Sequence, residues 1–355
     1  MVTKNKMKTP SLSIVSSPLI SVCIPIFDTE RYLAQCLKSV YTQDFDSFEI
    51  VVVSDKSTGH DQNERSAKKI VKLSQKESNS WRKKNALSPI EIRFRENHEN
   101  RGLIEVRRTL MYEARGLYMT QVDSDDEMEA GALRALWEAA DNDGIDIVHG
   151  TSTAGTFDEE GNFTPTKENR YGKIFYGTIK GRDVFSRWLL NGDFTANTWG
   201  KLIKRELWQK AYENIPYTEC NMADDVLLFF FLAQYAKTYI GIENKVYRYR
   251  INTGMTSARK INSLHKWKMI ASTASVFTVL SSWIQEHPDS LLPEEVESVR
   301  QKTRFYLQNN LLQLRETVAP ELQNEARAML CDMWGEHFVE RAEKSTIEKT
   351  PIEKT

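Results

Sequence analysis

The sequence is short of the features that mark secreted, membrane-spanning and nucleic-acid-binding proteins. Its four cysteines (Cys23, Cys36, Cys220 and Cys331) have neither a metal-site nor a disulfide spacing, and three lie among apolar residues. The longest apolar run, residues 226–233, is far below the about 20 residues that span a bilayer. A net charge of −1 does not favour nucleic-acid binding. We therefore expect a cytoplasmic protein that binds no nucleic acid, with peripheral contact at the inner face of the cell membrane as the alternative.

Length and composition predict a globular protein of more than one part. The 355 residues are 40% apolar and 27% charged, and at about 150 residues per domain they suggest two domains, or one with an extension. We expect four regions: a flexible N-terminus (1–17), an α/β domain (18–258), a helical region (259–342) and a disordered tail (343–355). The tail is low in apolar residues and repeats Ile-Glu-Lys-Thr.

The stretch from Gly116 to Asp126 organises the rest of the chain. A short β-prone run, residues 117–122, leads directly into Asp123, Asp125 and Asp126. Carboxylates this close together repel one another unless a cation lies between them, and oxygen ligands suit Mg²⁺ or Mn²⁺. The stretch therefore predicts a metal–phosphate site at the end of a buried strand. The alternative is a polar turn that caps a helix starting near Glu129.

Strand and helix patterns alternate through the first half of the chain. Buried strands are predicted at 19–27, 48–53, 90–94, 117–122 and 145–148, with amphipathic helices between them. This alternation predicts an α/β fold: a mostly parallel, Rossmann-like sheet flanked by helices. Pro25 indicates an edge strand or a strand end. We expect residues 76–87 to be a surface insertion, 238–250 a pair of β-segments around Glu243-Asn244, and the chain after Ile261 a helical extension.

Acidic residues follow several of these strands. Because the carboxyl ends of parallel strands line one crevice, Asp28, Asp55 and the group at 123–126 are expected to lie together. A nucleotide bound there needs an acceptor for a base imide, a partner for the ribose and a metal for the diphosphate. Asp55, Asp123 and Asp125 suit these roles in that order. The alternative for Asp55 is an Asx-turn in its own loop.

The order and spacing of these segments resemble family 2 glycosyltransferases of the GT-A fold. The segments that carry the resemblance are Ile20–Asp28, Phe48–Thr58, Asn100–Leu103 with Arg107, and Asp123–Asp126. The resemblance implies a nucleotide-sugar-dependent transferase with Asp123-Ser124-Asp125 as its Asp-x-Asp motif. It also implies donor contacts, which we assign to Pro25, Phe27, Asp28, Asp55, Arg107, Asp123, Ser124 and Arg250.

Three later features extend the resemblance. Asp224-Asp225 precedes an apolar helix, and the resemblance implies Asp225 as the catalytic base. The alternative is an acidic helix start that the helix dipole alone favours. Residues 249–257 resemble a segment that closes over the donor phosphates. Residues 198–202 resemble the start of the acceptor side, where Trp199 and Asp224 are acceptor candidates; the alternative for Trp199 is a buried core residue. The sequence departs from the family at Ser54, Lys56, Arg108 and Asn252, and the last change puts a histidine metal ligand in doubt.

These observations predict an inverting glycosyltransferase. With Mn²⁺ or Mg²⁺ at Asp125, it is expected to move sugar from a UDP-sugar to a hydroxyl of a glycan or lipid-linked saccharide in cell-surface polysaccharide synthesis. The alternatives are a sugar nucleotidyltransferase, whose Gly-rich basic loop is missing after the first strand, and a non-catalytic glycan-binding subunit. The helices of 259–342 are expected to pack on the catalytic domain, with acceptor recognition, homo-oligomer formation and membrane contact as further roles.

Overall fold

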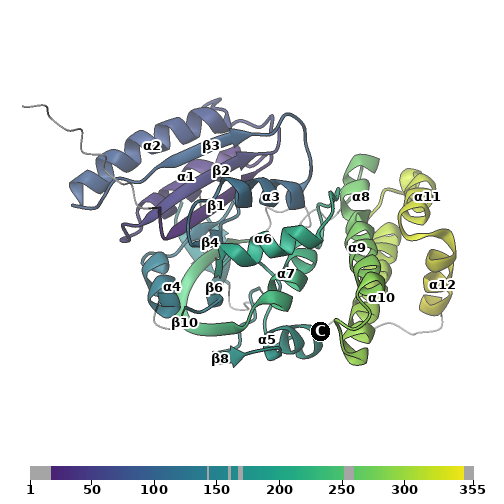
Figure 1. The fold of residues 1–355 in the computed structure, drawn as a ribbon. Coiled ribbons are helices and arrows are strands. Elements are labelled where there is room, and N and C mark those ends of the chain that lie inside the picture. Colours follow the sequence, from purple (N-terminus) through teal and green to yellow (C-terminus); the bar gives the residue numbers. More distant parts are fainter. Residues whose placement is uncertain (1–16, 142–143, 159–160, 167–170, 252–259, 348–355) are drawn as a thin grey trace, which may run out of the picture.

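A computed structural model describes residues 17–141, 144–158, 161–166, 171–251 and 260–347 (Figure 1). Within these residues ten strands form one sheet, in the order β3-β2-β1-β4-β9-β6-β10-β5, with β7 paired to β6 and β8 to β10. The strands are β1 (Ile20–Ile26), β2 (Phe48–Ser54), β3 (Ile92–Glu96), β4 (Tyr118–Gln121), β5 (Glu127–Met128), β6 (Ile147–Phe157), β7 (Phe163–Pro165), β8 (Gly177–Lys180), β9 (Lys201–Lys204) and β10 (Thr238–Arg250).

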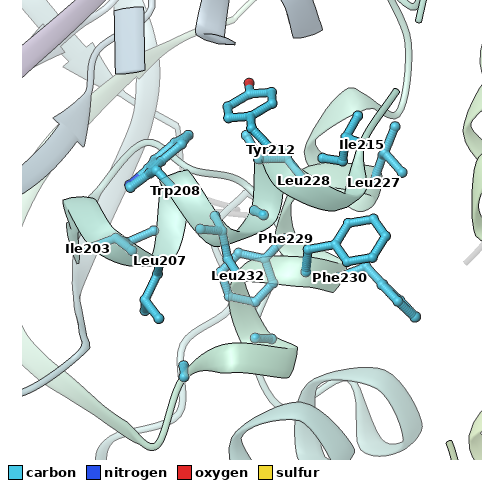
Figure 2. Close-up of a cluster of buried hydrophobic side chains, with 14 of the residues drawn as sticks. Ile203, Leu207, Trp208, Tyr212, Ile215, Leu227, Leu228, Phe229, Phe230 and Leu232 are labelled. Carbon is cyan, nitrogen blue, oxygen red and sulfur yellow. The ribbon is translucent and has the colours of Figure 1, made fainter. Parts of the chain in front are cut away.

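Helices cover both faces of this sheet. Those of the α/β part are α1 (Glu30–Tyr41), α2 (Ala67–Lys84), α3 (Leu103–Glu113), α4 (Ala132–Asp141), α5 (Asp183–Ser186), the π-helical turn η1 (Arg187–Asn191), α6 (Arg205–Asn214) and α7 (Asp224–Tyr235). Alternate residues of β1 and β2 point to opposite faces, so each face has its own apolar core. One core includes side chains of α1, α2 and α4, and the other those of α3, α6 and α7. Figure 2 shows Trp208 of α6 and Phe229 of α7 in the second core.

Parallel pairing of β1 with β2 and β4, and of β2 with β3, confirms the predicted fold class. β1 is a central strand, so Pro25 marks a strand end and not an edge. The last β1 residue paired with β4 is Cys23, and Pro25 lies beyond that ladder. Its missing N–H therefore costs no hydrogen bond to β4. Cys23, Cys36 and Cys220 are buried, and Cys331 is partly exposed.

The predicted surface insertion at 76–87 is wrong, because α2 continues to Lys84. The cause is Arg82, whose side chain is fully buried. It donates hydrogen bonds to the carbonyl oxygens of Gln43 (2.9 Å) and Phe45 (2.7 Å), which lie just after α1. A charged residue on the inner face of the helix removes the apolar periodicity that would have predicted it.

The predicted pair of β-segments at 238–250 is one strand, β10. It runs parallel to β6, with register shifts between Ile242 and Lys245 and between Lys245 and Tyr247. These irregularities fall where a turn was predicted at Glu243-Asn244. The strand therefore bends without ending, and its last residues reach Gly155 near the end of β6.

The helical extension comprises α8 (Leu264–Ala271), α9 (Thr273–Glu286), α10 (Pro293–Glu316), the 3₁₀ turn η3 (Pro320–Leu322), α11 (Gln323–Trp334) and α12 (Glu336–Ile347). It stands beside α6 and α7 (Figure 1), and apolar side chains of α9 such as Phe277 join the core of the α/β part. Buried Glu295 of α10 accepts a hydrogen bond from Ser186 of α5 at 2.7 Å. The last helix passes the boundary predicted at residue 342. Residues 1–16 and 348–355, where flexible ends were predicted, lie outside the described residues.

Candidate active site

The segments that follow β1 and β2 are joined by hydrogen bonds at the carboxyl edge of the sheet. Asp28 adopts a left-handed conformation with φ of 54°. Its Oδ1 accepts hydrogen bonds from Ser57 Oγ (3.2 Å) and the Thr58 amide (3.3 Å). Pro25 is buried in the strand, whereas Phe27 leaves 37% of its surface exposed beside this junction. Of the predicted donor contacts from β1, Phe27 and Asp28 therefore present accessible side chains.

Asp55 is buried and holds a neighbouring loop in place. Its carboxylate accepts hydrogen bonds from Asn97 Nδ2 (2.8 Å) and from the amides of Arg101 (3.0 Å) and Gly102 (2.9 Å). Burial raises the pKa of Asp55, and these hydrogen bonds oppose the rise. These contacts lie outside its own loop, unlike those of an Asx-turn. Three donors leave room for a fourth, since a carboxylate offers about four acceptor positions.

The carboxylates of the Asp-x-Asp segment and of the residue after it differ in exposure. Asp123 and Asp125 are partly exposed. Asp126 is buried and accepts hydrogen bonds from Tyr247 Oη (2.8 Å) and the Arg250 amide (2.6 Å). Ser124 is also buried, 2.6 Å from Thr29 Oγ1. The sequence grouped Asp126 with the other two, but its contacts are those of a structural anchor for β10.

The carboxylates here favour protonation. Burial, opposed by the nearby Arg107 and reinforced by Asp125, raises the pKa of Asp123 to about 6. Burial and the charges of Asp125 and Asp123 raise the pKa of Asp126 well above its usual range. The raised pKa values therefore reflect burial first, with repulsion from the neighbouring carboxylates added to it.

Arg107 connects the Asp-x-Asp segment to the second acidic group. Its side chain, 5% exposed, forms an ion pair with Asp224 and lies 3.7 Å from Asp123 Oδ1. Burial, opposed by Arg107, raises the pKa of Asp224 to about 6. Asp225 is partly exposed, and its Oδ1 accepts a hydrogen bond from the amide of Val226 at 2.8 Å. Among the described ion pairs none includes Asp225, so the pair divides into an ion-paired carboxylate and an accessible one.

Arg250 reaches the Asp-x-Asp segment from β10. Its Nε donates a hydrogen bond to the carbonyl oxygen of Asp125 at 2.7 Å. Trp199, by contrast, is 8% exposed and stacks on Tyr247, with ring centroids 4.7 Å apart. This packing fits the core alternative for Trp199, because little of its ring is left to meet a sugar. Asn252, the position at which the sequence put a histidine metal ligand in doubt, lies outside the described residues.

The carboxylates at this edge fit a metal that takes few protein ligands. Across the described residues, no three His, Cys, Asp or Glu side chains are grouped to hold an ion by themselves. Mg²⁺ normally takes one or two protein carboxylates and completes its shell with water and substrate phosphates. Asp125 is partly exposed and lies beside Asp123, whose pKa is raised. Asp125 can therefore supply one of the few carboxylates that Mg²⁺ needs.

Comparison with known proteins gives the family. The model of "Glycosyl transferase family 2" matches residues 21–210, more than half of the chain. The chain belongs to glycosyl transferase family 2. As a member, it is a glycosyltransferase. The matched residues contain β1, β2, β4 and the Asp-x-Asp segment, whereas the acidic pair at 224–225 lies beyond them.

Individual proteins are similar to this chain only at low sequence identity. EpsH of Bacillus subtilis is 23% identical over 275 residues, which cover 77% of this transferase and 71% of EpsH. The "GalNAc(5)-diNAcBac-PP-undecaprenol beta-1,3-glucosyltransferase" of Campylobacter jejuni is 31% identical over 147 residues, 41% of each chain. The crystal structure of S. aureus TarS 1-349 in complex with UDP-GlcNAc aligns over 92% of both chains with 18% identity and a TM-score of 0.49.

Sequence reasoning missed one residue at the centre of this transferase's site. Tyr247 Oη accepts a hydrogen bond from the Asp123 amide (3.0 Å) and donates one to Asp126, so it orients the Asp-x-Asp segment. Its place two residues before Tyr249-Arg250 was the available signal, because alternate residues of a strand share a face. It was overlooked because aromatic residues in strands are ordinarily core residues.

Proposed function

We propose that this transferase is a metal-dependent, inverting enzyme. It moves sugar from a UDP-sugar to a hydroxyl of a glycan or lipid-linked saccharide in cell-surface polysaccharide synthesis, at the cytoplasmic side of the membrane. The observation that carries the proposal is the position of Arg107 between Asp123 and Asp224. It joins a donor-side carboxylate to an acceptor-side pair and leaves Asp225 outside the ion pair.

The donor lies along the ends of β1, β2 and β4. Phe27 and Asp28 border the nucleoside, Asp55 accepts from the base imide at its remaining acceptor position, and Asp123 receives the ribose hydroxyls. Arg250 neutralises diphosphate charge. Three further residues position the donor site without contacting the donor. Pro25 holds the end of β1, Ser124 holds the Asp-x-Asp turn, and Arg107 holds Asp123. The hydrogen bond between Ser124 and Thr29 and the ion pairs of Arg107 support this positioning role.

Asp125, with Asp123 beside it, would hold Mn²⁺ or Mg²⁺. Such an ion would supply Lewis-acid stabilisation of the departing diphosphate. The surplus of carboxylates at this edge supports this assignment, because a divalent cation offsets their repulsion. Asp123 and Asp125 follow the end of β4, which is where open α/β sheets bind their ligands.

Asp225 takes the proton from the acceptor hydroxyl as that oxygen attacks the anomeric carbon and the nucleoside diphosphate leaves. A single displacement inverts the anomeric configuration. Arg107 holds Asp224, which positions Asp225 at the start of α7. Trp199 packs on Tyr247 and supports the site from the core without contacting the acceptor. The name of the Campylobacter relative, which specifies an undecaprenol-linked acceptor, supports a lipid-linked saccharide here.

The experiment is a transfer assay with purified protein, Mn²⁺, a panel of nucleotide sugars and undecaprenyl-diphosphate-linked saccharides. Turnover of one UDP-sugar, with a product anomeric proton of opposite configuration by NMR, is the expected outcome. Retention of configuration would refute the single displacement. Turnover that persists in EDTA would refute the metal.

A further inference from the structure

The helical extension packs against α7, the helix that begins with the acidic pair. The indole of Trp283 in α9 packs edge-on against Phe230 and Phe231 of α7, with ring centroids 5.6 and 5.4 Å apart. Phe277, also of α9, belongs to the same apolar core. The proposed function assigns no task to this extension, although it borders the helix that carries the proposed base.

A hydrogen bond ties the extension to the loop that leads into α7. The amide of Asn221, three residues before Asp224, donates to Ser272 Oγ at 3.1 Å, and Ser272 is buried at the junction of α8 and α9. Ala223, directly before the acidic pair, has a φ of 60°, a left-handed conformation that costs a non-glycine residue free energy. The extension therefore helps to hold a strained turn that orients Asp224 and Asp225.

Tyr306 of α10 brings a hydroxyl group close to the same pair. Its ring packs against that of Phe277, with centroids 5.1 Å apart, and its side chain is partly exposed. Burial first, and then the charges of Asp225 and Asp224, raise the pKa of the Tyr306 hydroxyl. This hydroxyl therefore stays protonated, and it lies near enough to the acidic pair to be affected by its charge.

The Tyr306 hydroxyl has no hydrogen-bond partner among the residues that the structure describes. The core tyrosines Tyr212 and Tyr247, by contrast, donate to Ile104 O at 2.9 Å and to Asp126 at 2.8 Å. A tyrosine hydroxyl in an apolar setting ordinarily has such a partner. A partly exposed hydroxyl without one, beside the proposed base, is available to a ligand.

We propose that the helical extension forms one wall of the acceptor site and that the Tyr306 hydroxyl hydrogen-bonds to the acceptor saccharide. The inference rests on the proposed function, in which Asp225 takes the proton from that acceptor. A sugar carries several hydroxyl groups, each both a donor and an acceptor, and a phenol can take either role. Tyr306 binds a sugar hydroxyl other than the one that Asp225 deprotonates. It therefore contributes to acceptor affinity, while other residues bind the donor.

Calorimetry on the full chain tests this with glucose, N-acetylglucosamine and N-acetylgalactosamine, each linked to geranyl diphosphate. UDP replaces the donor sugar, so no transfer occurs. Tyr306→Phe removes one hydroxyl and keeps the ring that packs on Phe277. It should weaken binding of the preferred saccharide about tenfold, the loss of one hydrogen bond that the saccharide leaves unmade. The Kd of UDP and the Tm should not change.

Tyr235→Phe is the matched control, because it removes the hydroxyl of a tyrosine at the other end of α7. That hydroxyl accepts a hydrogen bond from Asn214 Nδ2 at 2.8 Å. The control should leave saccharide affinity unchanged. Geranyl diphosphate without a sugar should bind equally to Tyr306→Phe and to the unmodified chain. An equal loss in both variants, a loss for the sugar-free probe, or no gain in affinity from any sugar would overturn the proposal.

Saccharide binding and transfer are judged separately. If Tyr306→Phe weakens saccharide binding but no UDP-sugar is transferred, the proposed function fails and the role of Tyr306 stands. If transfer occurs and Tyr306→Phe binds the saccharides as tightly as the unmodified chain does, the proposed function stands and the role of Tyr306 is refuted.

Discussion

Carboxylates lie at both ends of the parallel strands, and their pKa values shift in opposite directions at the two ends. At the amino end, Glu49 of β2 is 2% exposed. It accepts hydrogen bonds from Ser21 Oγ (2.7 Å) and Arg115 Nε (2.9 Å) and pairs with Arg93 at 3.0 Å. Burial alone would raise its pKa, but these contacts together lower the pKa of Glu49 below its usual value.

At the carboxyl end the balance is reversed. Burial raises the pKa of Asp123, Asp126 and Asp224, and Arg107 contacts two of these carboxylates without offsetting the rise. The amino end therefore neutralises its own charge and contributes to stability. The carboxyl end holds repelling charges at a cost in stability, which a bound cation would reverse. The two ends therefore differ in the partners of their carboxylates and not in burial alone.

The largest expected effect concerns Asp225, the carboxylate outside the ion pair. Asp225→Asn keeps the shape of the side chain but cannot accept a proton, so kcat should fall by about 10²–10⁴-fold. UDP binding should be unchanged, because the base acts on the acceptor. Steady-state transfer rates and calorimetry with UDP measure the two quantities.

Asp224→Asn is the matched variant, one residue away and held by Arg107. Its loss of kcat should be milder, because Asp224 is held by Arg107 and positions Asp225 without itself accepting the proton. A harmless Asp225→Asn beside an inactive Asp224→Asn would move the base to Asp224.

Stability should respond oppositely at the two ends. Glu49→Gln should lower the free energy of unfolding by roughly 2 kcal/mol, with kcat unchanged, because it weakens a buried carboxylate's contacts with two arginines. Asp123→Asn should raise it by roughly 1 kcal/mol in EDTA at pH 7.5, because it removes a repelling charge. Urea denaturation measures both. A loss of stability in both variants would remove the distinction between the two ends.

The pH dependence should sharpen the same contrast. Because the pKa values of Asp123 and Asp224 are raised to about 6, their protonated side chains contribute stability at pH values below the ordinary aspartate pKa. This contribution is lost as the pH rises through 6. Glu49, with its lowered pKa, contributes at neutral pH and loses its contribution in acid. Mn²⁺ with UDP should therefore raise Tm clearly at pH 7.5 and little at pH 5, where protons compete for the carboxylates. Equal shifts at the two pH values in a thermal melt would contradict this.

The smallest effect concerns Asp55 and the nucleotide base. Asp55→Asn retains part of the hydrogen bonding to Asn97 and Gly102 but replaces one acceptor oxygen with a donor. A site that accepts from uracil should then lose its preference for UDP over CDP, which we expect to be about tenfold in Kd. Calorimetry with both nucleotides measures it. A preference unchanged by Asp55→Asn would confine Asp55 to its structural role.

The sequence predicted most of the α/β sheet, because its central strands are continuous apolar runs. It failed where polar groups are buried. Buried Arg82 interrupts the apolar pattern in the second half of α2, so that part of the helix was not predicted. At Glu243-Asn244 the sequence predicted a turn where β10 only bends. The antiparallel strand β9, which lies between β4 and β6, was not predicted, because a four-residue strand without alternation gives little signal.

For the site, the sequence identified which residues belong together but not how they divide their tasks. It expected Asp28, Asp55 and the group at 123–126 at one edge. Asp28, Asp123 and Asp125 prove accessible there, whereas Asp55 and Asp126 are buried. It assigned Arg107 to the donor but did not predict that this side chain forms an ion pair with Asp224. Spacing along the chain does not reveal such pairs, because residues 107 and 224 meet only through the packing of α3 against α7.

The most direct test of the central claim, that the carboxyl end binds a divalent cation together with a diphosphate, is calorimetric titration of UDP with and without Mn²⁺. The account predicts that Mn²⁺ tightens UDP binding at least about tenfold and that Asp125→Asn abolishes this gain, while Glu49→Gln leaves it intact. Equal UDP affinity in Mn²⁺ and in EDTA, or a full Mn²⁺ effect in Asp125→Asn, would contradict it.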